Sequence, residues 1–389
     1  MVFFIIRTGS SLQICISNCA DNSSDACIYS ELFTDRSRMS LWEIEMKEEK
    51  RILYYDLLNI SACISVIILH HNGLAHVFTG DIIWKECLVA EVAFYWAVPI
   101  FLMLSGATLL NYREKYSTKI FFRKRILRVG IPWIFWSVLI LIWKTLSGDF
   151  IWENYSIREF VNVILNSKME VIYWFFPVIL GLYMFIPVLS VLTKLEYRKI
   201  LWYIVGYSLV VDATLPLICS LVNVQWNGAI SSPLNGYVIF MILGYLLSTE
   251  DISEKYRKVI YAIGIMGGIT RYVGIYLLSM RDGAINGIFF SYVQIHSFAL
   301  ATAIFIFFKY INWDRIFGKM TQKWIAQISG CSLGIYLIHR RLMDYELRII
   351  PFSESSLWWR VGGVIATYGI CLVIVYVVKK VPVVEKVFP

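Results

Sequence analysis

Residues 51–71 read RILYYDLLNISACISVIILHH, a largely apolar stretch that begins with a charge and ends in two histidines. As a helix it is long enough to cross about 30 Å of hydrocarbon at about 1.5 Å per residue. Each helical residue turns by about 100°, so Asn59 and His70 return to nearly the same face, and Asp56 and Cys63 fall close to it. Polar groups are costly in a bilayer and usually face a protein interior or a watery cavity. The stretch therefore predicts a membrane helix with a polar stripe along one face.

The composition places the whole chain in the membrane class. The 389 residues are 58% hydrophobic and 16% charged, whereas soluble domains carry about 25% charged residues. The net charge of +8 is explained by basic loops on one side of a membrane, so no nucleic-acid partner is expected. The eight cysteines form no CxxC pair and no Cys/His spacing typical of a zinc site, so no metal is expected either.

Ten apolar stretches follow one another along the chain, so we expect an all-α polytopic protein with about ten transmembrane helices in a lipid bilayer. Basic residues concentrate in alternate loops, most densely at 113–128, which places these loops and both termini in the cytoplasm. His70 then lies near the outer face, and Asp56 and Asn59 lie near the inner one. The expected spans are 52–72, 88–110, 127–146, 171–193, 200–221, 232–248, 258–279, 286–308, 325–343 and 357–378.

Residues 1–45 differ from the remainder of the chain. A short apolar run precedes a polar stretch rich in Ser, Asn and Asp, and Arg7 follows the apolar run, whereas a signal peptide carries its positive charge before it. We interpret residues 1–45 as a poorly ordered extension or an over-long gene start, with an amphipathic anchor as the alternative. Residues 46–389 are assigned to one membrane domain.

The histidine pair at the end of the first span is the leading candidate for chemistry. Adjacent helical positions point about 100° apart, so we expect only one of His70 and His71 to face the interior fully, and His70 shares the polar stripe. An imidazole titrates near neutrality and can take a proton from a hydroxyl that attacks an acyl group. The alternative is an interfacial histidine solvated at a helix end.

Arg125 and Arg128 lie three residues apart in FFRKRILR and therefore share a helical face. Two such guanidinium groups can hold a phosphate or diphosphate through charge-assisted hydrogen bonds, and their predicted cytoplasmic position suits a cytoplasmic phosphorylated ligand. The alternative is ordinary positive-inside charge, or contact with anionic lipid.

Other ionisable residues fall within or beside later spans, and Arg271 is the most informative of them. An Arg near the bilayer midplane requires a partner or water, and we expect Asp212 to be that partner. The pair serves either as a structural ion pair or as a substrate contact. Glu91 is a candidate to orient His70 across the outer mouth of the first two spans, and His339 ends the ninth.

Together these stretches resemble the acyltransferase type 3 family of integral-membrane O-acyltransferases. The first span of that family has an Asp, an Arg three residues later and a His eleven after the Arg, which matches Asp56 and His70, with Asn59 in place of the Arg. Further matches are VPIFLMLSG ending at Gly106, RILRVGIPWIFW with Arg125 and Arg128, WFFPVILGLYMFIPVLS from Trp174, and SLGIYLIH ending at His339. The similarity covers about residues 46–378.

The resemblance implies transfer of an acyl group, often acetyl, from cytoplasmic acyl-CoA to a hydroxyl of a cell-surface or lipid-linked glycan at the inner or plasma membrane. It implies that His70 is the catalytic base or acyl-relaying group and that Arg125 and Arg128 hold CoA. The candidate substrate or supporting residues are Asp56, Asn59, Glu91, Arg271 and His339. The alternative function is that of a transporter or flippase-like protein that moves a glycan or small acid without chemistry. The chain has no Walker, GxSxG or HExxH motif to indicate nucleotide hydrolysis or soluble-type hydrolase chemistry.

Overall fold

The computed structural model describes residues 2–8, 11–17, 51–349, 353–381, 384 and 387–388. Two strands, β1 (Val2–Thr8) and β2 (Ser11–Ser17), form an antiparallel hairpin. The chain divides into two units, Met1–Arg51 and Ile52–Pro389. The all-α prediction is therefore confirmed for the described residues from 51 onward, and the hairpin is the departure from it. Residues 18–45 lie outside the described residues, so the interpretation of the N-terminal segment stays a prediction.

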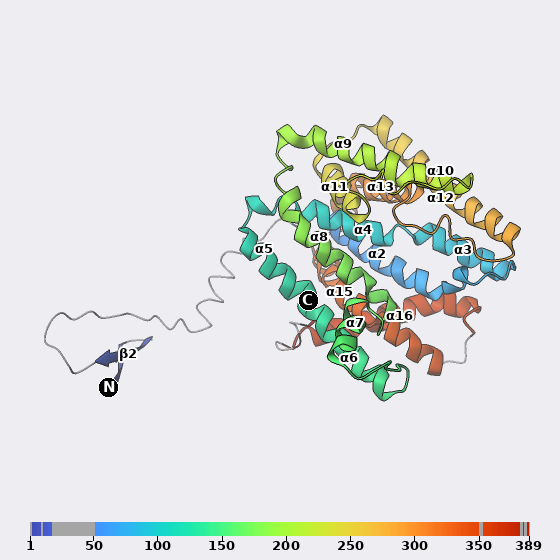
Figure 1. Cartoon of the computed structure of the whole chain (residues 1–389). Coiled ribbons are helices and arrows are strands. Elements are labelled where there is room, and N and C mark those ends of the chain that lie inside the picture. Colours follow the sequence, from blue (N-terminus) through green and yellow to red (C-terminus); the bar gives the residue numbers. More distant parts are fainter. Residues whose placement is uncertain are drawn as a thin grey trace. The chain divides into compact units, whose positions relative to one another are not determined.

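The second unit is built from helices joined by loops of varied length (Figure 1). Three segments are π-helical and continue directly into or out of longer helices: η3 (Ile126–Gly130), η6 (Leu209–Thr214) and η7 (Trp358–Gly363). The α-helices are α2 (Leu53–His71), α3 (Ile82–Phe94), α4 (Ala97–Leu109), α5 (Thr118–Arg125), α6 (Ile131–Leu146), α7 (Ile157–Leu165), α8 (Phe175–Leu189), α9 (Arg198–Ser208), α10 (Leu215–Leu221), α11 (Tyr237–Thr249), α12 (Glu254–Asp282), α13 (Ile295–Tyr310), α14 (Trp313–Ile316), α15 (Lys319–Ile349) and α16 (Val364–Val378).

Within the described part of the chain, seven helical segments are long and apolar enough to cross a membrane. They are Leu53–His71, Ile82–Glu114, Thr118–Leu146, Val171–Leu189, Leu195–Leu221, Glu254–Asp282 and Trp358–Val378. The prediction of a multi-pass membrane protein is confirmed. The other three expected spans coincide with α11 and α13, which are shorter apolar helices, and with α15, so the count of ten and the cytoplasmic termini stay predictions.

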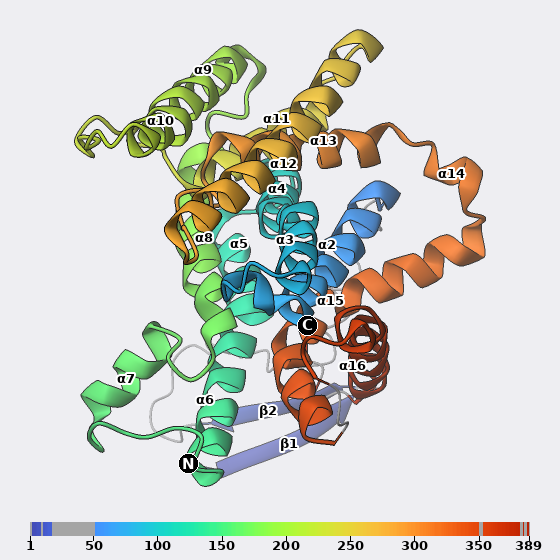
Figure 2. The ribbon, with the colours of Figure 1, turned by 90° about the vertical axis from the view of Figure 1, so that its right-hand side faces the viewer.

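Helix α2 is enclosed by other helices on opposite sides. It packs against α3, α4, α15 and α16, and Figures 1 and 2 show it between α4 and the α15–α16 pair. Leu58 and Ala62 join the large buried cluster that includes α4 and α11, whereas Cys63 and Ile67 join a second cluster with α15 and α16. Polar groups on more than one face of α2 therefore contact protein. Exposure of those groups to the hydrocarbon of a bilayer would be costly.

Helices α4 and α11 approach closely through a reciprocal pair of glycines. A Cβ atom at Gly106 would lie 1.9 Å from the Met241 carbonyl oxygen, and one at Gly244 would lie 2.2 Å from the Met103 carbonyl oxygen. Small residues allow such backbone contact between membrane helices, where dispersion forces replace the hydrophobic effect. The contact explains why a glycine closes the VPIFLMLSG stretch, and it fixes α4 against α11.

Candidate active site

The polar stripe of α2 faces α15 along a seam of paired residues whose register shifts by no more than one residue. The Asn59 side-chain amide donates to Ser329, at 2.9 Å to its carbonyl oxygen and 3.0 Å to its hydroxyl. The pairs are Asn59 with Ser329, Cys63 with Ser332, and His70 with His339. The two helices are parallel in this seam, which extends about 16 Å over the eleven residues between Asn59 and His70. Asp56, one turn before Asn59, is also buried.

At the predicted outer end of the seam, His70 and His339 face each other with ring centroids 5.3 Å apart. His339 is fully buried, and its Nδ1 lies 2.8 Å from the carbonyl oxygen of Tyr336 and 3.2 Å from that of Ile335. Carbonyl oxygens only accept hydrogen bonds, so we assign the proton to Nδ1. The Nε2 lone pair of His339 is left buried, without a hydrogen bond to the described residues. Nε2 of His339 is thus a proton acceptor next to His70 that no described residue occupies.

Of the two adjacent histidines, His71 is the fully buried one and His70 keeps an intermediate exposure, so the expectation that His70 is the one that faces the interior fully is wrong. His71 is 1% exposed, and its ring packs 4.3 Å from the Trp359 ring. Nε2 lies 2.9 Å from the Thr367 hydroxyl, which donates to Glu346 Oε2 at 2.6 Å. Because a hydroxyl carries one proton, Thr367 accepts from His71 when it donates to Glu346. This His71–Thr367–Glu346 chain ties the residue beside His70 to α15 and α16.

The two arginines of the predicted phosphate clamp have different surroundings. Arg125 ends α5, and its guanidinium carbon lies 5.8 Å from the ring centroid of Tyr183 on α8. Its Nε is buried and makes no hydrogen bond within the described residues. Arg128 is exposed and lies in η3, a π-helical segment of the kind that often marks functional positions. Their joint contact with one phosphate stays a prediction.

The predicted pairing of Arg271 with Asp212 is wrong, because Arg271 pairs with Glu91. The Arg271 Nη2 and Glu91 Oε1 atoms are 3.2 Å apart, and both side chains are buried. The Arg271 guanidinium also lies over the Tyr95 ring, 3.2 Å from its centroid, a favourable cation–π position. Glu91 is directed at Arg271 and at His76, 3.7 Å away, so the hypothesis that it orients His70 is wrong too.

Asp212 is instead satisfied by three serines, one on the preceding helix and two in the loop after α10. Its carboxylate accepts hydrogen bonds from the Ser208 hydroxyl at 2.7 Å, the Ser231 hydroxyl at 3.1 Å and the Ser232 backbone N–H at 3.0 Å. These three donors remove the need for a cation. The negative charge of Asp212 alone is therefore not sufficient to identify it as the partner of Arg271.

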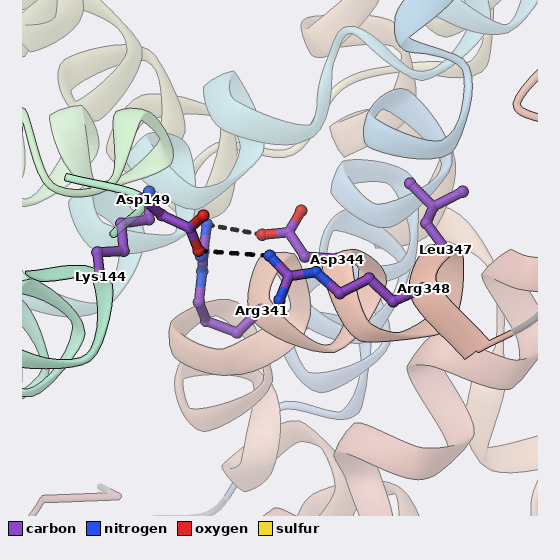
Figure 3. A pocket seen from close by; sticks show the side chains of 6 residues that line it. All are labelled: Lys144, Asp149, Arg341, Asp344, Leu347 and Arg348. Atoms are coloured by element: carbon purple, nitrogen blue, oxygen red, sulfur yellow. Dashed lines mark hydrogen bonds and ion pairs between the residues drawn. The ribbon is translucent and has the colours of Figure 1, made fainter. Parts of the chain in front are cut away.

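A polar cleft lies on the part of α15 that follows His339 (Figure 3). Its volume is about 390 Å³, and its lining residues are Lys144, Asp149, Arg341, Asp344, Leu347 and Arg348. Sequence reasoning missed this site because its basic residues were counted only as outer-loop charge. A usable signal was the Arg340–Arg341 pair directly after His339, on the side of the membrane where basic residues are sparse.

Comparison with known proteins gives one match. A family model described as an acyltransferase domain matches residues 52–376, from the start of α2 to nearly the end of α16. The matched region contains the α2–α15 seam, both arginines of the predicted clamp and the polar cleft. No curated protein and no solved structure matches the chain.

Proposed function

The chain belongs to the acyltransferase type 3 family, and on this premise we propose that it moves an acyl group, most simply acetyl, from cytoplasmic acyl-CoA to a hydroxyl of a cell-surface or lipid-linked polysaccharide. It is an acyltransferase of the multi-pass membrane type. The proposed site is the inner or plasma membrane, where a cytoplasmic donor and an external acceptor can reach opposite ends of one seam.

The observation that carries the proposal is the His70–His339 pair at the end of the α2–α15 seam. In the proposed reaction the acceptor oxygen forms a bond to the acyl carbonyl carbon while the carbon–sulfur bond of the thioester breaks. His70 takes the hydroxyl proton, which ends on the thiolate sulfur of CoA. General-base catalysis of this kind contributes about 10²–10⁴-fold in rate. His339 supports His70 with a neutral, basic Nε2 atom at the same site.

The donor side of the proposal rests on Arg125 and Arg128. Both precede α6 in the most basic predicted cytoplasmic segment, and forked guanidinium groups match the diphosphate of CoA. Asn59 stands where the family has an Arg, and its amide is used by Ser329. We therefore propose that Asn59 joins α2 to α15 and that the charge for CoA comes from Arg125 and Arg128.

The proposal is tested by turnover of radiolabelled acetyl-CoA in membranes that contain the full chain. We expect label to appear in glycan, His70→Ala to abolish this transfer, and His76→Gln, a change at a half-exposed histidine, to leave it intact. Arg125→Ala and Arg128→Ala should each weaken acetyl-CoA binding by about 1–3 kcal/mol. A chain that ignores acetyl-CoA but moves a glycan across vesicles would be a transporter, and transfer at the normal rate by His70→Ala would remove the catalytic assignment.

A further inference from the structure

The polar cleft on α15 joins two separate parts of the fold. Lys144 comes from the end of α6 and Asp149 from the loop after it, whereas Arg341, Asp344 and Arg348 lie on α15. Figure 3 shows Arg341 directed at Asp344 and Arg348 directed at Asp149 across the cleft. The volume of about 390 Å³ is within the range of small-ligand sites, about 300–1,000 Å³.

The charges of the cleft are balanced by one another. Arg341 pairs with Asp344 at 2.8 Å and with Glu170 at 2.6 Å, and Lys144 lies 3.7 Å from the same Glu170 carboxylate. These pairs leave little net field to attract an anion, but they present both hydrogen-bond donors and acceptors. The buried Nε of Arg341 makes no hydrogen bond within the described residues, so donor capacity remains.

The outer pair of the cleft is open to a ligand. Arg348 and Asp149 are 3.3 Å apart, with side chains 61% and 41% exposed. A hydrogen bond from the Ser147 hydroxyl, together with Arg348, holds the pKa of Asp149 below its ordinary value. Asp149 is therefore ionised at neutral pH and accepts hydrogen bonds only. An exposed ion pair of this kind adds little to stability, so it is free to exchange its contacts with ligand hydroxyls.

The loop that contains Asp149 also carries a stacked pair of aromatic rings. Trp152 donates from its indole nitrogen to the Thr145 hydroxyl at 3.0 Å, which holds the ring against the end of α6. Tyr155 is 88% exposed and stacks on Trp152 with centroids 5.8 Å apart. Amphipathic rings on the same loop as a paired donor and acceptor match a sugar, which has apolar C–H faces and a rim of hydroxyls.

The cleft and the histidine pair share α15 but lie on different faces of it. Arg341 follows His339 by two residues, a rise of about 3 Å and a turn of about 200° around the helix axis. The Tyr173 hydroxyl donates to the Leu337 carbonyl oxygen at 2.8 Å, so the segment that contains Glu170 is fixed against the same turn of the helix. A ligand in the cleft would therefore be held across α15 from His339.

We propose that this cleft binds a neutral sugar unit of the acceptor glycan and so holds the glycan at α15, the helix that carries His339, an inference that rests on the proposed acyl transfer. Balanced ion pairs select hydroxyl-rich neutral sugars over uronic acids, because a carboxylate would have to compete with Asp149, Asp344 and Glu170 for the same cations.

The test measures binding of maltotriose, chitotriose, mannotriose and trigalacturonate to the purified full chain in micelles, without acyl donor. We expect at least one neutral trisaccharide to bind, and Asp149→Asn or Arg348→Gln to weaken it at least fivefold. Lys258→Gln breaks a more exposed ion pair on α12 and should change nothing. Absence of binding by every neutral probe, tighter binding of trigalacturonate, or unchanged binding in both cleft variants overturns the proposal.

A charge exchange separates ligand contact from structural support. The double variant Asp149→Arg, Arg348→Asp keeps the ion pair but exchanges donor and acceptor positions, so we expect binding to stay impaired while thermal stability stays normal. Full recovery of binding would show that the pair is only structural. Sugar binding without acyl transfer would contradict the proposed reaction and leave the sugar-binding proposal intact. Acyl transfer with an unchanged acceptor KM in both Asp149→Asn and Arg348→Gln would contradict the sugar-binding proposal and leave the proposed reaction intact.

Discussion

The imidazole rings of His70 and His339 lie 5.3 Å apart although they belong to helices from opposite ends of the chain. Their meeting depends on the parallel register of α2 and α15, which the Asn59–Ser329 hydrogen bonds fix nearer the predicted inner end. A packed seam thus controls the geometry of the two imidazole groups. Effects on the site can be expected from residues that never touch it.

The tautomer of His339 gives a prediction for two isosteric substitutions. Asn can imitate the Nδ1–H that bonds to the Ile335 and Tyr336 carbonyl oxygens, whereas Gln extends a polar atom toward the position of Nε2. If Nε2 serves the reaction, His339→Asn should fold normally and lose about 10²-fold in acyl transfer, and His339→Gln should retain more activity. Rates are to be measured beside His76→Gln as control. Equal activity of His339→Asn and the unchanged chain would contradict the assignment.

Thr367 links His71 to Glu346, so its hydroxyl is expected to matter more than its size. Thr367→Val leaves two buried polar groups without their partner and should lower the unfolding free energy by about 2–4 kcal/mol. Thr367→Ser keeps the hydroxyl and loses one methyl group, at about 1 kcal/mol. Thermal unfolding in detergent checks both. Similar losses for Val and Ser would mean that packing, not the hydrogen-bonded chain, holds the end of α2.

Glu346 gives the stability of the protein a predictable pH dependence. Burial raises the pKa of its carboxyl, although the hydrogen bond from Thr367 partly opposes this. The folded state therefore holds this proton to a higher pH than the unfolded state does. The contribution of Glu346 to the free energy of unfolding should therefore fall as pH rises from about 4.3, the ordinary Glu pKa, through the raised pKa of the folded state. Glu346→Gln should remove that slope in unfolding measured from pH 4 to pH 8, and an unchanged slope would contradict the cause.

Periodicity was sufficient to predict the polar stripe of α2, because helical geometry alone decides which residues share a face. It was insufficient to predict the partner of that stripe. Nothing local in the sequence states that Ser329 and Ser332 of α15 meet Asn59 and Cys63, since helix pairing is a tertiary choice. The histidine expectation failed for the same reason. His71 is buried because α16 covers a second face of α2. The prediction of a single polar stripe assumes that the other faces of α2 contact lipid.

The identity of buried ion pairs was not predictable from residue type either. Arg271 had two acidic candidates, Asp212 and Glu91, and the sequence does not tell which one its own neighbours already satisfy. Three donors from Ser208, Ser231 and Ser232 occupy Asp212, so Glu91 is the carboxylate left for Arg271. A buried charge pairs with a group that other residues have not already satisfied, because an unpaired ion in the interior costs far more free energy than a change of partner.

The Gly106–Gly244 contact gives the last prediction, on stability. Gly106→Ala places a Cβ atom on the Met241 carbonyl oxygen, and backbone cannot yield as a side-chain tip can. We expect α4 and α11 to separate and the unfolding free energy to fall by at least about 1–3 kcal/mol, the usual cost of overpacking. Gly181→Ala on α8 is the matched control, since a Cβ there meets nothing within 4 Å, and loss of a helical glycine should stabilise by up to about 1 kcal/mol. Thermal unfolding of both variants decides the matter. If Gly106→Ala is as stable as Gly181→Ala, the two helices do not touch through these glycines, and the support of α2 by α4 must come from elsewhere.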